Sequence, residues 1–128
     1  MTAPSIILVV DDNDAGQLLV CSVLELNGFG VESARSSEEV FERLSVRTPD
    51  LILMDIQLPG QDGLSLTRQL KSNPSTARTP IIALTANAMP GDREQAFAAG
   101  CSGYISKPIN TRKLADQIRE FLSLEHPQ

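Results

Sequence analysis

The sequence predicts an α/β domain built around a parallel β-sheet. Apolar runs alternate with helical patterns along the chain, and two of the runs, residues 6–10 and 51–54, are almost wholly apolar. Runs of this length and β-branched content are typical of strands buried on both faces of a sheet. The alternation favours parallel strands joined by helices, and right-handed crossovers then place helices on both faces. The pattern alone leaves the order of the strands open.

Five apolar runs are expected to form the strands. The second run contains the polar Glu32 and Ser33, which suit a strand at the edge of the sheet. The expected strands are residues 5–10, 31–34, 51–54, 81–84 and 104–106.

Local sequence signals mark where the first two helices begin and end. The first runs from about Asp14 to the Asn-Gly pair at residues 27–28, a combination typical of helix C-termini. The second opens with the capping box of Ser36 and Glu39 and stops before Pro49, because the residue before a proline disfavours helical geometry.

The three remaining helices have similar signals. The Asp-Gly pair at residues 62–63 leads into the third helix, which ends before the turn cluster at residues 72–75. The fourth is expected at about residues 91–99, with Gly100 after it, and Asn110 can cap the last helix. The apolar positions expected to face the core are Val40, Phe41, Leu44, Leu64, Leu66, Leu70, Leu114, Ile118 and Phe121.

Composition and charge limit the kinds of protein that this chain can be. The 128 residues fit one domain over residues 1–128, with a core at about 6–122. The net charge of −5, without a Lys/Arg-rich block, argues against direct binding of nucleic acid. Neither a signal peptide nor an apolar run near the roughly 20 residues that span a bilayer is found, so we expect a cytoplasmic location and no membrane association.

Cysteine and histidine are too few to build a catalytic or zinc site. Cys21 and Cys101 have no metal-ligand spacing, and each is expected to be a lone cysteine that is buried or neutral. The only histidine, His126, lies in the C-terminal tail.

Acids, a hydroxyl and an amine stand where strands end. Asp11 and Asp12 follow the first strand, Asp55 ends the third, and Thr85 and Lys107 end the last two. Parallel strands bring these ends to one edge, where open α/β sheets bind ligands. Three carboxylates in one crevice repel each other unless a cation lies among them, and Mg²⁺ prefers such oxygen ligands. A hydroxyl and an ammonium beside them suit a phosphoryl group.

Four motifs contain these residues, at positions 10–13, 53–63, 83–86 and 103–109. In order and spacing they resemble the receiver domain of bacterial two-component response regulators, the CheY-like superfamily. The resemblance covers residues 6–122 and implies a flavodoxin-like, doubly wound sheet of five parallel strands in the order 2-1-3-4-5 with five helices. The last motif ends in Ile109, and this ending is most similar to that of stand-alone receivers and of receivers of hybrid kinases.

The resemblance implies a phosphorelay function. Asp55 would accept a phosphoryl group from the phosphohistidine of a sensor histidine kinase or histidine phosphotransfer protein, and the chain would then switch conformation to control a downstream protein. Thr85 and Lys107 would each hold a phosphoryl oxygen. The chain would catalyse only its own phosphorylation and dephosphorylation, so it is not expected to be an enzyme.

The resemblance also implies a magnesium site. Asp12 and Asp55 would bind Mg²⁺ directly, Asp11 would act mostly through water, and the backbone carbonyl of Gln57 would be the third protein ligand. The ion would neutralise charge on the transferring group.

Further roles follow from the same resemblance. Thr85 and Tyr104 would switch together, and the Lys107-Pro108 bond would be cis. Gln57 and Asn87 would border the phosphoryl group and tune its lifetime.

Three other functions are alternatives. An aspartate-nucleophile phosphatase usually has a second Asp two residues after the nucleophile, where this chain has Gln57. A flavin-binding relative needs a phosphate-binding loop after the first strand, where residues 11–14 are acidic. A receiver that binds partners without phosphorylation stays open, as does the choice between a single-domain regulator and part of a longer protein.

The first helix is a candidate docking surface. Residues 18–26 are apolar nearly all round, more than one buried stripe requires. We expect some of them to be exposed and to meet the histidine-bearing helices of the partner. A homodimer face and deeper burial are the alternatives.

Overall fold

The computed structural model describes residues 4–58, 61–85, 90–107 and 109–125. Its main sheet has five parallel strands in the order β2-β1-β3-β6-β7, which is the predicted order 2-1-3-4-5. The strands are β1 (Ile6–Val10), β2 (Gly30–Ala34), β3 (Leu51–Asp55), β6 (Ile81–Thr85) and β7 (Gly103–Ser106).

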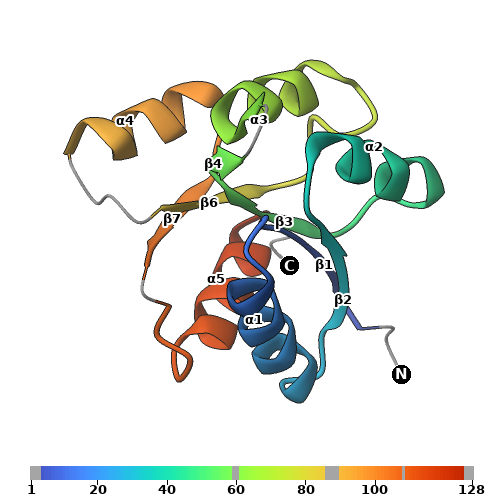
Figure 1. Cartoon of the computed structure of the whole chain (residues 1–128), viewed down its shortest axis with the longest axis vertical. Helices are drawn as coiled ribbons and strands as arrows, with labels where there is room; N and C mark the ends of the chain where they lie inside the picture. The colour runs from blue at the N-terminus through green and yellow to red at the C-terminus, as the bar shows by residue number, and fades with distance from the viewer. Residues whose placement is uncertain (1–3, 59–60, 86–89, 108, 126–128) are drawn as a thin grey trace.

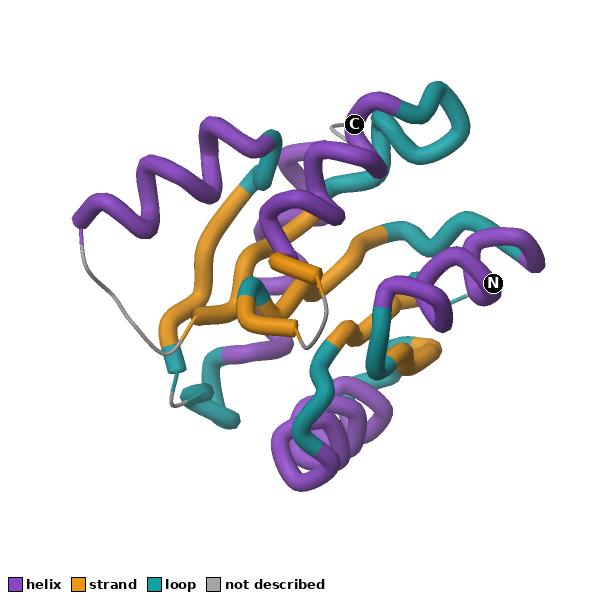
Figure 2. Tube along the Cα trace, turned by 45° about the horizontal axis from the view of Figure 1, so that its top comes forward, coloured by secondary structure: helices purple, strands orange, loops and turns teal. Residues whose placement is uncertain are grey.

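Helices cover both faces of the sheet, as predicted. Figure 1 shows α1 and α5 on one face and α2, α3 and α4 on the other. Figure 2 shows the same two layers of helix with the strands between them. The helices are α1 (Asp14–Leu26), α2 (Ser37–Val46), α3 (Gly63–Ser72), α4 (Pro90–Ala99) and α5 (Leu114–Glu125).

The central strands are buried on both sides, which explains their unbroken apolar sequences. Alternate residues point to opposite faces, so Leu8 and Ile52 join the core under α2, α3 and α4, while Val9 joins the core under α1 and α5. Burying a side chain of this size contributes about 1.5–3 kcal/mol to stability. The two cores fix the strands, and the strands fix the loops at their ends.

The edge position predicted for the second strand is confirmed. β2 lies at one end of the sheet and pairs only with β1 among the described strands. Its Glu32 is half-buried and forms an ion pair with Arg47 at 3.2 Å. Polar residues are tolerated here because one side of the strand lacks a neighbouring strand.

Three local details refine the predictions, and one of them, the burial of Phe41, is a correction. Phe41 is 42% exposed, because it lies about 100° around the helix from Val40, outside the buried stripe of Val40 and Leu44. The last helix begins at Leu114, and a turn at residues 111–113 leads into it: the Asn110 side chain accepts from the Arg112 amide at 3.0 Å and the Asn110 carbonyl accepts from the Leu114 amide at 3.0 Å, as expected of a cap at the start of this turn. The loop after Asp55 contains a short antiparallel pair, β4 (Gln57–Leu58) and β5 (Gln61–Asp62), which the sequence did not predict.

Candidate functional site

Asp11 is held at the end of β1 by its backbone and its side chain. The Asp11 amide donates to the Ala34 carbonyl at 3.1 Å, and the Asp11 Oδ1 accepts from the Asn13 amide at 2.9 Å. Only 2% of the residue is exposed. Asp12, the next residue, is exposed. The first acid of the pair is therefore fixed within the protein and the second faces the solvent.

Asp55 ends β3 and is 5% exposed. The next amide, that of Ile56, donates to the Leu84 carbonyl at 3.1 Å, and the Ile56 carbonyl accepts from Gly63 at 3.1 Å. A Cβ on Gly63 would overlap the carbonyl oxygen of Asp55. The start of α3 therefore packs against the backbone of the acid, and only glycine fits there.

Lys107 connects the two buried acids. Its Nζ lies 3.2 Å from Asp55 Oδ2 and 3.5 Å from Asp11 Oδ2. Partial burial by itself would lower the pKa of the Lys107 amine, but the charges of Asp55 and then Asp11, and its hydrogen bonds to them, outweigh burial and raise that pKa. The amine is therefore held in its charged form between the two carboxylates.

Thr85 and Tyr104 lie on neighbouring strands. Thr85 ends β6, is 1% exposed, and its carbonyl accepts from the Lys107 amide at 2.7 Å. Tyr104 pairs in register with Ala83 and is half-buried against the core under α2, α3 and α4. Since Ala83 and Thr85 are two residues apart, the threonine and the tyrosine belong to the same face of the sheet.

The acidic cluster has the composition of a cation site. Asp11, Asp12 and Asp55 each offer a carboxylate oxygen, and these oxygens all lie within 4.8 Å of one another. Lys107 supplies one positive charge against three negative ones. Two of the acids are nearly fully buried, so the remaining repulsion is poorly screened. A divalent cation with oxygen ligands fits this donor set.

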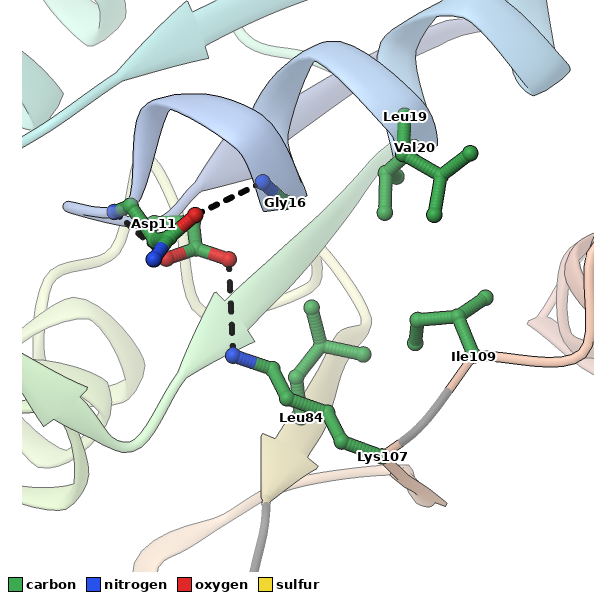
Figure 3. A pocket seen from close by; sticks show the side chains of 8 residues that line it. Asp11, Gly16, Leu19, Val20, Leu84, Lys107 and Ile109 are labelled. Carbon is green, nitrogen blue, oxygen red and sulfur yellow. Dashed lines mark hydrogen bonds and ion pairs between the residues drawn. The ribbon is translucent and has the colours of Figure 1, made fainter.

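A pocket opens beside this cluster, on the side of α1 (Figure 3). Its volume is about 300 Å³. Asp11 and Lys107 lie at its polar end, and mostly apolar side chains form the rest of the wall. The lining residues are Asp11, Asn13, Gly16, Leu19, Val20, Leu84, Lys107 and Ile109.

Several predicted site residues lie partly or wholly outside the described part of the chain. The backbone of Gln57 is described, in β4 directly after the acid, but its side chain is not. Asn87 and Pro108 fall outside the described residues, and with them the expected cis bond after Lys107.

Two glycines and two amides at the site were missed as functional residues. Gly16 and Gly63 lie against the acids, and Asn13 both caps α1 and donates to Asp11. The Gln17 side chain donates to the carbonyls of Val9 and Ala34, which ties α1 to two strands. The glycines stand beside helix starts in the sequence, but what they touch depends on packing between distant segments.

No helix among the described residues has both the length and the hydropathy needed to cross a membrane.

Known proteins resemble the chain over nearly its full length. The polar-differentiation response regulator DivK of Brucella anthropi is 38% identical over 119 residues, which are 93% of this chain and 97% of that protein. The receiver domain of a histidine kinase from Syntrophus aciditrophicus has a TM-score of 0.86 and 31% identity, covering 97% of this chain and 94% of that one.

A third relative carries a metal. The receiver domain of a sensor histidine kinase from Pseudomonas aeruginosa, solved with a magnesium ion coordinated in its active-site cleft, has a TM-score of 0.85 and 35% identity. The match covers 94% of this chain and 99% of that one.

A match to a family model identifies the family of the chain. The model of the response regulator receiver domain matches residues 7–119, which include every acid of the cluster, Thr85 and Lys107. This match decides against the phosphatase and the flavin-binding alternatives. The chain therefore belongs to the response regulator receiver domain family, a family of signalling proteins.

Proposed function

We propose that the chain is a phosphoacceptor in a two-component phosphorelay and that Asp55 is the residue phosphorylated. The observation that carries this proposal is the position of the Lys107 amine, 3.2 Å from Asp55 and 3.5 Å from Asp11. A cation poised beside a buried carboxylate suits the arrival of a phosphoryl group, which brings about two negative charges. We take residues 1–128 to be one receiver domain.

The proposed step transfers the phosphoryl group between two side chains. A carboxylate oxygen of Asp55 attacks phosphorus, the bond from phosphorus to the partner's imidazole nitrogen breaks, and its electron pair stays on the imidazole. Lys107 and the hydroxyl of Thr85 each hold an oxygen of the transferred group. Hydrolysis of the resulting acyl phosphate returns Asp55, so the chain acts on its own phosphate rather than on an outside substrate.

Mg²⁺ is the proposed cofactor, and the acidic cluster supports it. Asp12 and Asp55 would hold the ion, with Asp11 acting through water and the Gln57 carbonyl as a further ligand. The ion would supply positive charge that offsets the charge of the phosphoryl oxygens. The residues present suit this role, because the three carboxylates have one lysine among them.

The proposed output is a conformational switch. Thr85 would move toward the phosphoryl group and Tyr104 would turn inward behind it, changing the surface that a downstream protein meets. Their common face of the sheet supports this coupling. Gln57 and Asn87 would set how long the phosphate lasts.

The proposed phosphodonor is a sensor histidine kinase or a histidine phosphotransfer protein in the cytoplasm. It would dock on the first half of α1, where Leu18 is 69% and Leu19 is 46% exposed. Leu19 also lines the pocket that reaches Asp11 and Lys107, so an apolar contact here lies beside the acceptor.

Acetyl phosphate tests the acceptor without a partner. Intact mass of the native chain should show a phosphoryl adduct that depends on Mg²⁺, and Asp55→Asn should lack it. The control is Asp50→Asn, which changes an exposed acid whose Oδ2 accepts from the Ile6 amide at the other end of the strands. An adduct that persists in Asp55→Asn would place the phosphate elsewhere.

A further inference from the structure

Gly16 is placed directly beside the carboxylate of Asp11. A Cβ at this position would lie 3.2 Å from Asp11 Oδ2 and 3.5 Å from Asn13 Oδ1. The first of these contacts is tighter than most that a Cβ makes in proteins, so a side chain here would force the carboxylate to shift. Figure 3 shows Gly16 on the first turn of α1, next to Asp11.

The carboxylate has little room to shift. Its Oδ1 accepts from the Asn13 amide at 2.9 Å, and its Oδ2 faces Lys107 at 3.5 Å. Asn13 is itself fixed, because its Oδ1 accepts from the Gly16 amide at 2.8 Å. A change at residue 16 would therefore move an acid whose two oxygens have separate partners.

Backbone geometry does not explain the glycine. Among the described residues, the glycines with positive φ are Gly28 and Gly100, so Gly16 adopts a conformation open to any residue. Glycine within a helix costs stability relative to alanine. The limited space beside the Asp11 carboxylate therefore explains why residue 16 is glycine.

We propose that Gly16 is a positioning residue for Asp11 and thereby sets the preference of the acidic cluster for Mg²⁺ over larger cations. This inference rests on the proposed magnesium site. Mg²⁺ requires near-ideal octahedral geometry at short distances, whereas Ca²⁺ accepts longer and less regular coordination. Asp11 would act through a water on the ion, so a displaced Asp11 would move a ligand that Mg²⁺ needs at an octahedral position. The displacement therefore weakens Mg²⁺ binding more than Ca²⁺ binding.

Gly91 provides a matched control. Like Gly16, it lies in the first turn of a helix, α4, but a Cβ there would meet nothing within 4 Å. Gly16→Ala and Gly91→Ala thus make the same chemical change with and without a neighbouring carboxylate.

The first measurement is metal affinity. The unphosphorylated protein is titrated with Mg²⁺ and with Ca²⁺, and binding is monitored by NMR. Gly16→Ala should bind Mg²⁺ about tenfold more weakly, the lower end of what lost support of a metal ligand costs. It should lose less affinity for Ca²⁺, and Gly91→Ala should match the native chain for both ions. An unchanged ratio of the two affinities in Gly16→Ala overturns the proposal.

The second measurement needs no metal. In EDTA, the urea midpoint of Gly16→Ala is compared in the native background and in Asp11→Ala. In the Asp11→Ala background, Gly16→Ala should raise the urea midpoint as Gly91→Ala does. In the native background, where the Asp11 carboxylate is present, the rise should be smaller or reversed. Equal shifts in both backgrounds overturn the proposal.

The two measurements separate the two hypotheses. If the native chain binds no Mg²⁺ at the cluster, the magnesium site of the proposed function is wrong, while the urea comparison still decides whether Gly16 positions Asp11.

Discussion

The amine of Lys107 lies 3.2 Å from a carboxylate oxygen of Asp55, although 52 residues separate the two in the chain. The same amine also faces Asp11. The ends of three parallel strands thus place one cation among acids that would otherwise repel one another.

Removing charge from this cluster should change stability in opposite directions. Asp12→Asn removes a repelling charge and leaves both ion pairs of Lys107, so it should stabilise the metal-free protein by up to about 1 kcal/mol. Lys107→Met removes the cation and should destabilise it by about 2 kcal/mol, because two buried acids lose their partner. Urea unfolding in EDTA measures both.

Asp116→Asn is the control for these changes, since Asp116 pairs with Arg119 on the exposed side of α5. Its effect should stay within about 0.5 kcal/mol. Equal effects of all three substitutions would contradict the proposed repulsion.

The pKa of Lys107 should lie above the ordinary value of 10.5, because the charges of Asp55 and Asp11 outweigh partial burial. The unfolded chain holds the ordinary value, so the stability contributed by this charge is complete below pH 10.5 and is lost as pH rises through the folded pKa. NMR titration of the lysine side chain should give the raised midpoint, and Asp55→Asn should lower it. A midpoint unaffected by Asp55→Asn would refute the coupling.

Helix α1 should show where the phosphodonor docks. Leu18→Glu and Leu19→Glu place charge on the exposed apolar surface near the acids, and each should slow transfer from a phosphohistidine protein by about tenfold or more. Labelling by acetyl phosphate should be unchanged, because the small donor needs no docking surface. The rates of both reactions are measured for each variant.

Leu26→Glu is the control on the same helix. Leu26 is 87% exposed and lies about 10 Å further along the axis from Leu19. If it slows transfer as much as the other two, or if none of them does, the partner docks elsewhere.

Tyr104 should report the switch. It is the only tyrosine and the chain has no tryptophan, so its ring signals can be followed directly by NMR. Adding beryllium fluoride with Mg²⁺ should change its environment in the native protein, and Thr85→Ala should suppress the change. An unchanged ring environment in the native protein would argue against coupling.

The strands of the sheet could be predicted because each is specified by a short, continuous stretch of sequence. The apolar runs of β1 and β3 are buried on both faces, and each stops at an acid, so both the strands and their chemical ends are visible in the sequence. The strand order came from resemblance to a family. Phe41 was misplaced because its neighbours in the helix, not its hydrophobicity, decide whether it meets the core.

The finer structure of the site could not be predicted in this way. Gly16 and Gly63 depend on how helix starts approach the acids, which is a matter of packing between segments. The short β4–β5 pair joins two dipeptides, too short to show a period of alternation. The sequence identifies the reacting side chains, whereas their spacing is set by the folded core.

The most direct test of the central claim is transfer from a phosphorylated histidine phosphotransfer protein to this chain, followed by borohydride reduction and peptide mass mapping. Reduction converts an aspartyl phosphate to homoserine and so marks the acceptor. The account predicts homoserine at residue 55 in Mg²⁺ and none in EDTA or in Asp55→Asn. Homoserine at another acid, or equal transfer without Mg²⁺, would contradict it.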